Sequence, residues 1–216
     1  MVFYYFSSML FKDRQEAGRK LAAALSLYKW AKKTLVLGLP RGGVVVAHEV
    51  AKSLGLPLDV IVPRKIGAPH NPELAIGALA GDVVFLDAKI ISALAVSQSH
   101  IDQTVAAEKK EAERRLALFR KNKPPQNFHG LTLLIVDDGI ATGATMRASI
   151  GALKKSGAAK IVVAIPVGPP DTLAILMNEV DEVVCLYTPA SFYAVGQFYD
   201  SFPQTTDEEV IGLLDG

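Results

Sequence analysis

Short apolar runs alternate with segments of helical spacing along most of the chain. The runs that we expect to form core strands are 34–38, 58–62, 133–136, 161–167 and 182–187. Their nearly unbroken apolar character is typical of strands that are buried on both faces of a parallel sheet. Strands that alternate with helices predict an α/β fold, a doubly wound and mainly parallel sheet with helices on both faces.

The segments between these runs predict the covering helices. Residues 44–54 have helical spacing and are followed by Gly55, a common helix terminator. A second helix is expected from Ala144 to about Gly157, and a third begins near 169–171. Near the start of the chain, Asp13 and Glu16 form a capping-box pattern that predicts another helix.

Three regions depart from this alternation. Residues 63–72 contain prolines and a glycine, so we expect an irregular loop there. Residues 75–79 and 83–86 predict a β pair. Residues 89–123 are rich in interleaved acids and cations, which predicts a solvated helix with Glu–Lys and Glu–Arg pairs.

The composition narrows the class of protein. Half of the 216 residues are hydrophobic and 21% are charged, as in an ordinary globular domain. The net charge of +1 gives no reason to expect nucleic-acid binding. The single cysteine, Cys185, excludes an internal disulfide and lies in an apolar run, so we expect a buried structural thiol in a reducing compartment. Residues 1–10 lack a basic leader, so we expect a cytoplasmic protein without a signal peptide or membrane span.

The stretch most informative about chemistry is 133–145, LLIVDDGIATGAT. An apolar strand ends in Asp137 and Asp138, and small residues then lead to a helix that begins at Ala144. The first N–H groups of a helix lack partners, so this turn can bind a phosphate. Two carboxylates beside it suit the vicinal hydroxyls of a ribose 5-phosphate. The alternative is an ordinary strand–turn–helix whose acids cap the helix.

A second turn, Pro40-Arg41-Gly42-Gly43, follows the strand at 34–38. Its glycines permit unusual backbone geometry, and consecutive N–H groups there can form an anion site. On its own, a plain tight turn with a solvated arginine is the better interpretation. Right-handed crossovers would place both turns at the carboxyl edge of the sheet.

The stretch 133–145 resembles the signature of type I phosphoribosyltransferases, which bind phosphoribosyl pyrophosphate. Together with FKDRQEAG, LPRGGVVVA and VPRKIGAPHNPELAIGAL, it looks most like a group of stand-alone phosphoribosyltransferases whose acceptor is not settled. The resemblance implies transfer of ribose 5-phosphate to a nitrogenous acceptor, with a nucleobase favoured, and release of pyrophosphate, as in nucleotide salvage. The residues it implies for donor binding are Asp137, Asp138, Gly139, Ala141, Thr142, Gly143, Ala144, Thr145, Pro40, Arg41, Gly42 and Gly43.

The resemblance also implies catalytic candidates besides the two acids and Arg41. Orotate enzymes carry Arg–Lys at the start of a mobile loop, with a lysine and a histidine beyond. Arg64, Lys65 and His70 fit this spacing and make 63–72 a candidate lid, although Ala68 stands where the lysine is expected.

The resemblance leaves the acceptor unassigned. The C-terminal pattern is similar to the base-binding hood of hypoxanthine-guanine enzymes, which suggests Phe192, Tyr193 and Asp200 as base-binding residues. These rings could instead pack a C-terminal subdomain. Ala141 occupies the place of an aspartate in the 6-oxopurine enzymes, which resembles the adenine and orotate enzymes instead. The general acid or base is therefore also unassigned.

Mg²⁺ is the expected cofactor. It would bind through donor oxygens and water, without direct protein ligands, and Asp137 and Asp138 could reach it through water. The expected partners are small molecules, without nucleic acid or membrane, and a homodimer stays open. We expect one domain over 1–216, with a charged helical insertion at about 89–123 and a hood at about 188–216. The alternative function is a non-catalytic sensor or regulator that binds the same donor or a nucleotide.

Overall fold

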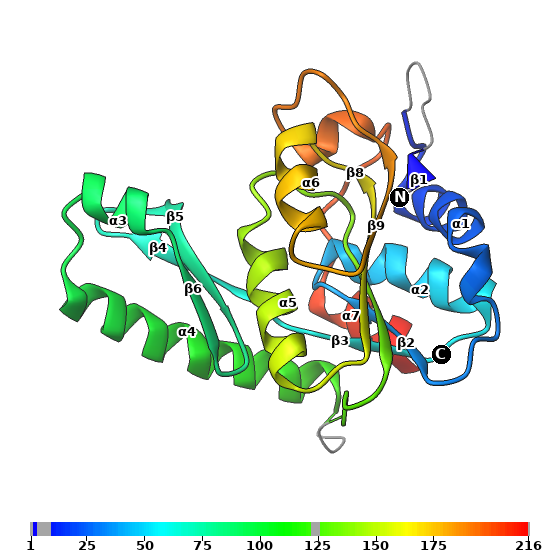
Figure 1. Ribbon diagram of the computed structural model, residues 1–216, viewed down its shortest axis with the longest axis horizontal. Coiled ribbons are helices and arrows are strands. Elements are labelled where there is room, and N and C mark those ends of the chain that lie inside the picture. Colours follow the sequence, from blue (N-terminus) through cyan, green and yellow to red (C-terminus); the bar gives the residue numbers. More distant parts are fainter. Residues whose placement is uncertain (1, 4–9, 122–125, 216) are drawn as a thin grey trace.

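A parallel sheet forms the body of the computed structural model, which describes residues 2–3, 10–121 and 126–215 (Figure 1). Its strand order is β1-β9-β8-β7-β2-β3, and all of these strands pair in parallel. The strands are β1 (Val2–Phe3), β2 (Thr34–Gly38), β3 (Leu58–Val60), β7 (Thr132–Val136), β8 (Lys160–Val167) and β9 (Glu182–Tyr187). The direction of chain progression reverses between the neighbours β2 and β7, and ligands bind preferentially beside such a point.

Helices cover both faces of this sheet, which confirms the predicted fold class. Helices α1 (Arg14–Ala24) and α2 (Gly42–Leu54) pack on one face, and α5 (Ala144–Lys155) and α6 (Pro170–Met177) pack on the other (Figure 1). Side chains alternate along the strands, so Val36 packs with the first pair of helices and Leu35 with the second. Burial on both faces explains why the strands are apolar throughout.

Local signals place several helix ends. Asp13 caps α1, since its Oδ1 accepts a 2.7 Å hydrogen bond from the N–H of Glu16. The carboxylate of Glu16 accepts from the N–H of Lys12 instead of Asp13, so only half of the predicted capping box forms. Helix α2 ends at Gly55, which has a φ of 65°. A 3-10 turn, η1 (Ser26–Tyr28), follows α1.

An arm of residues 64–119 extends from one side of the body (Figure 1). It contains an antiparallel sheet of β4 (Arg64–Ala68), β5 (Asn71–Ala80) and β6 (Val83–Leu86), with helices α3 (Ala88–Ala93) and α4 (Gln98–Phe119). The prediction of an irregular loop over 63–72 is therefore wrong. Residues 64–68 pair with β5, and a register irregularity near Gly67 accommodates the turn-forming residues.

The charged segment at 89–123 is two helices in the described residues instead of one. A break at 94–97 separates α3 from α4, where Ser97 caps the second helix by accepting from the N–H of His100. Helix α4 is also not fully solvated, because Ile101, Ala112 and Phe119 are buried in a cluster that includes residues of the arm sheet, α2 and β3. At 22 residues it is the longest described helix, yet neither it nor any other described helix combines the length and apolarity needed to cross a bilayer.

The C-terminal region expected to form a hood divides into two parts. Residues 188–202, with the 3-10 turn η2 (Val195–Phe198), lie against the body near α1. Helix α7 (Asp207–Asp215) instead packs between α2 and α4, where Val210 is fully buried (Figure 1). The last helix therefore joins the body to the arm.

Candidate active site

The turns after β2 and β7 contact each other at the carboxyl edge of the sheet. The N–H of Leu39 donates to the carbonyl of Val136 at 3.0 Å, which ties the start of one turn to the end of the other strand. A Cβ atom on Gly42 would lie 2.1 Å from Oδ2 of Asp138. A Cβ atom on Gly43 would lie 2.6 Å from Oδ1 of Asp137. Only glycine therefore lets the second turn approach the carboxylates this closely.

Two helix N-termini face this junction without a side-chain cap. Helix α2 begins after Arg41 and helix α5 after Gly143, and neither receives a capping hydrogen bond from a side chain. By contrast, Asp13, Asp87 and Ser97 cap α1, α3 and α4. Uncapped N–H groups and the positive end of the helix dipole suit an anion.

The turn before α5 is braced and open to solvent. Gly143 has a φ of 74°, in the left-handed region that favours glycine. The hydroxyl of Thr172 donates to the carbonyl of Ala141 at 2.7 Å, which fixes the turn from the neighbouring helix. Ala141 and Thr142 are exposed, so a ligand can reach this turn from solvent.

The two aspartates have different environments. Oδ1 of Asp137 accepts a 2.9 Å hydrogen bond from the N–H of Asp138. Burial raises the pKa of Asp137 well above its ordinary value, and the negative charge of Asp138 adds to this shift. Burial also raises the pKa of Asp138, but the guanidinium of Arg14 opposes that shift. The pair therefore carries its negative charge preferentially on Asp138.

Arg14 is a site residue that sequence analysis missed. Its Nε donates to Oδ2 of Asp138 at 2.7 Å, and its Nη1 donates to the carbonyl of Pro203 at 2.7 Å. Its guanidinium lies 3.7 Å from the ring centroid of Phe202. The only sequence signal was its place within FKDRQEAG, since nothing local indicates which acid it meets.

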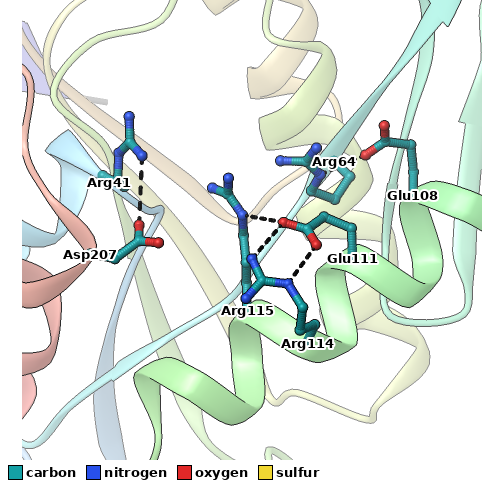
Figure 2. A network of polar contacts seen from close by, with 7 residues as sticks. All are labelled: Arg41, Arg64, Glu108, Glu111, Arg114, Arg115 and Asp207. Atoms are coloured by element: carbon teal, nitrogen blue, oxygen red, sulfur yellow. Dashed lines mark hydrogen bonds and ion pairs between the residues drawn. The ribbon is translucent and has the colours of Figure 1, made fainter.

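The predicted arginines of the site pair with acids on other elements (Figure 2). Nη1 of Arg41 lies 3.6 Å from Oδ1 of Asp207 on α7. Nε of Arg64 donates to Glu108 on α4 at 2.6 Å. Figure 2 shows both pairs close to the ion pairs of Glu111 with Arg114 and Arg115 on α4. Hydrogen bonds from these last two arginines lower the pKa of Glu111 to about 2.

His70 is not brought to the carboxylates. It is exposed in the turn between β4 and β5, with a φ of 62°. The adjacent end of β4 lies beside the start of α4, where His100 Nε2 is 3.0 Å from the carbonyl of Gly67. That is the end of the arm remote from the body (Figure 1). Lys65 has an exposed side chain, and Ala68 is buried in the arm.

Residues 188–202, which we call the hood segment, cover the start of the 137–143 turn. A Cβ atom on Gly139 would lie 2.5 Å from a methyl group of Val195, and the hydroxyl of Tyr199 donates to the carbonyl of Asp138 at 2.6 Å. Of the predicted base-binding residues, Phe192 is half-buried and packs 5.3 Å from the ring of Phe198. Tyr193 is 89% exposed, and Asp200 is also exposed.

Within the residues that the structure describes, no group of three or more His, Cys, Asp or Glu side chains could hold a metal ion, so a preformed metal cluster does not mark this site. A cavity of about 550 Å³ lies at the other edge of the sheet, lined by residues such as Trp30, Leu58 and Phe119. We locate the site by its converging glycines, carboxylates and helix N-termini instead, because that cavity has no comparable set of groups.

Comparison with known proteins identifies the family of the chain. The family model described as a phosphoribosyl transferase domain matches residues 10–187. Two curated proteins named "Putative phosphoribosyl transferase", from the CDC 1551 / Oshkosh and H37Rv strains of Mycobacterium tuberculosis, are 48% identical over 95% of the chain. The match covers 46% of each, so the chain spans about half the length of the curated relatives it matches. The crystal structure of TT1426 from Thermus thermophilus has a TM-score of 0.79 and 40% identity, covering 95% of this chain and 98% of that one.

Proposed function

The chain belongs to the phosphoribosyl transferase family, and from this premise we propose that it transfers ribose 5-phosphate from phosphoribosyl pyrophosphate to a nitrogenous acceptor. The observation that carries the proposal is the contact of Gly42 and Gly43 with Asp138 and Asp137 between two uncapped helix N-termini. The donor has a diol flanked by a phosphate and a pyrophosphate. Carboxylates flanked by two anion sites match that order of groups.

We assign the ribose and its 5-phosphate to the turn after β7. Asp137 and Asp138 would accept hydrogen bonds from the ribose hydroxyls, and their negative charge would favour the cationic ribose of the transition state. The phosphate would lie on the N–H groups of Gly143, Ala144 and Thr145, with the Thr142 hydroxyl beside them. Bracing by Thr172 would keep these donors in place during transfer.

The turn after β2 would take the pyrophosphate. The N–H groups at the start of α2 and the guanidinium of Arg41 would neutralise the leaving group, for which Arg41 must exchange its contact with Asp207. Arg64 and Lys65 stay candidates for the same task, because they begin β4 shortly after Val60 of β3, which pairs with Gly38 at the end of β2. His70 is a weaker candidate in this arrangement, since its turn is at the outer end of the arm.

Mg²⁺ fits the groups present. Two carboxylates are hard oxygen donors of the type that Mg²⁺ prefers, and they are too few to form a complete protein cage. Asp137 and Asp138 would therefore hold it through water, together with oxygens of the donor. When bound, Mg²⁺ would neutralise the pyrophosphate and make it a better leaving group.

We propose a nucleobase as the acceptor, with a place in nucleotide salvage. The hood segment passes over Gly139, so an acceptor beside the ribose would meet this segment first. Phe192 offers a partly exposed ring there, which suits stacking. Tyr193 and Asp200 are exposed and would have to act at the outer surface of this segment.

A non-catalytic sensor of the donor is the second candidate. It is favoured by Ala68 and Ala141, which supply no acid or base at two places where family enzymes carry one. The side chain of Ala68 is also buried in the arm. Such a protein would bind the donor and retain it intact.

Pyrophosphate release tests the proposal directly. The full chain would be incubated with phosphoribosyl pyrophosphate and Mg²⁺, with purine bases, pyrimidine bases or small amines added one at a time. Release that depends on one acceptor would establish the activity and its substrate class. Tight donor binding without release in any of these reactions would favour the sensor, and absence of donor binding would overturn both.

A further inference from the structure

Arg14 connects three parts of the site that are far apart in the sequence. It contacts Asp138 through Nε, the carbonyl of Pro203 through Nη1 and the ring of Phe202 through its guanidinium face. Its side chain is only 9% exposed. An arginine that is held at Nε, at Nη1 and on one face of its guanidinium has a fixed orientation.

A fourth contact of Arg14 is with the loop at Gly42. A Cβ atom there would lie 2.7 Å from Nε and 2.9 Å from Nη2 of Arg14. The same guanidinium therefore lies beside the carboxylate assigned to the ribose and beside the loop assigned to the pyrophosphate. A positive charge in such a poorly solvated position acts more strongly on nearby anions than one in water.

We propose that Arg14 is a positioning residue for the donor. It holds the carboxylate of Asp138 in one orientation toward a ribose hydroxyl, and it places a positive charge beside the loop that receives the pyrophosphate. Its action on the ribose passes through Asp138. This inference rests on the proposed function, because it takes phosphoribosyl pyrophosphate as the ligand.

A buried ion pair can also be purely structural. The chain contains a matched pair for this comparison, since Arg120 donates to both oxygens of Asp59 at 2.8 and 2.7 Å. The side chains of Arg120 and Asp59 are 10% and 16% exposed, against 9% and 15% for Arg14 and Asp138. Arg120 follows α4 and meets β3, which β2 separates from β7 and its two aspartates.

The test measures the affinity of phosphoribosyl pyrophosphate with Mg²⁺ by calorimetry at neutral pH, alongside thermal unfolding. Arg14→Met is expected to weaken binding by at least about tenfold, because a charged hydrogen bond to Asp138 is lost. Arg120→Met should lower the unfolding temperature and leave affinity within about twofold, because it lies outside the site.

Arg14→Lys separates charge from geometry and serves if Arg14→Met does not fold. The lysine keeps the positive charge but lacks the guanidinium fork, so this variant should bind the donor less tightly than the native chain. In an Asp138→Asn background, Arg14→Lys should have little further effect on affinity, because Arg14 acts through Asp138.

Four results would overturn the inference. One is equal loss of affinity in Arg14→Met and Arg120→Met. Two others are native affinity in Arg14→Lys and additive losses of affinity with Asp138→Asn. Any of these three would leave the proposed function standing. If the native chain does not bind phosphoribosyl pyrophosphate at all, the proposed function fails and this inference fails with it.

Discussion

Asp137 and Asp138 are adjacent in the sequence, yet their surroundings assign them different charges. Asp138 has a buried arginine as its partner, whereas Asp137 has the N–H of Asp138 and little solvent. Burial and the neighbouring charge therefore make ionisation of Asp137 costly. Such a carboxylate is kept at the expense of stability, which is typical of functional residues.

Asp137→Asn should separate the effect of Asp137 on stability from its effect on donor binding. We expect unchanged or increased thermal stability, because the amide carries no charge to bury. Affinity for phosphoribosyl pyrophosphate should fall by about 100-fold, or about 3 kcal/mol, since an amide N–H₂ donor replaces one of the oxygens that would accept from the ribose hydroxyls. Calorimetry and thermal unfolding would measure both, with the exposed Asp171→Asn as the control. Unchanged affinity would remove Asp137 from the site.

The raised pKa of Asp137 also gives this variant a pH signature. Between the ordinary aspartate pKa of about 4 and the raised value, the folded chain binds a proton that the unfolded chain does not. Asp137 therefore contributes stability as pH falls through this window and loses that contribution as pH rises. Denaturant titrations of native chain and variant should diverge there, and parallel curves would contradict the shift.

The contact between the two turns can be tested separately at Gly42. Gly42→Ala should weaken donor binding at least tenfold, about 1.4 kcal/mol, because the new Cβ would displace Asp138 and Arg14. Gly212→Ala on α7 is the control, since a Cβ there meets nothing within 4 Å. It should raise stability by about 0.5–1 kcal/mol without changing affinity. Calorimetry on both variants would decide, and native affinity in Gly42→Ala would contradict the role of this contact.

At the scale of elements, the first turn of α5 lacks the groups that would stabilise it. Its N-terminus has no side-chain cap and no acid in the first turn, although either would stabilise the helix. The absence of both keeps the N–H groups and the positive dipole end available to a phosphate.

Ala144→Asp tests this use of the helix. The acid should stabilise α5 by about 0.3–1 kcal/mol through the helix dipole and should lower donor affinity through repulsion of the phosphate. Ala88→Asp, at the exposed first residue of α3, is the matched control and should leave affinity unchanged. Affinity and unfolding temperature that fall together in Ala144→Asp would indicate misfolding instead.

The elements that sequence analysis placed well are those with strong local signals. Strands β2 and β9 have the predicted limits, and α2 ends at Gly55 as its left-handed conformation requires. The segment at 63–72 was misjudged because its prolines and glycine obscured a strand. That strand exists through pairing with β5, and bulges absorb the residues that disfavour it.

At the scale of the whole molecule, α7 holds the body and the arm together. Val210 is fully buried among residues of α2, α4 and the arm sheet. Asp207 at the start of the same helix contacts Arg41 in the site. A helix beyond the residues matched by the family model therefore supports both the fold and the turn after β2.

Val210→Ala should lower the free energy of unfolding by about 2 kcal/mol, because it removes buried methyl groups from a packed cluster. Val84→Ala on β6, where the side chain is 42% exposed, should cost less than about 1 kcal/mol. Urea denaturation monitored by circular dichroism would measure both. Equal costs would show that α7 is not tightly packed against the arm.

The sequence by itself determined the α/β class, most of the strands and helices, and the approach of the two turns to one edge. These follow from local rules, since apolar runs specify strands buried on both faces and parallel strands present their carboxyl ends at the same edge. Asp137 and Asp138 could be predicted as site residues because their motif is contiguous in the sequence.

Tertiary structure alone decided which side chains complete the site. Arg14 meets Asp138 across 124 residues, Arg41 meets Asp207 on the last helix, and His70 is carried to the outer end of the arm. The physical reason is that periodicity fixes the face on which a side chain lies, but not its partner from a distant segment. That partner depends on how the packed elements pair and cross, and these contacts are not encoded in any local pattern.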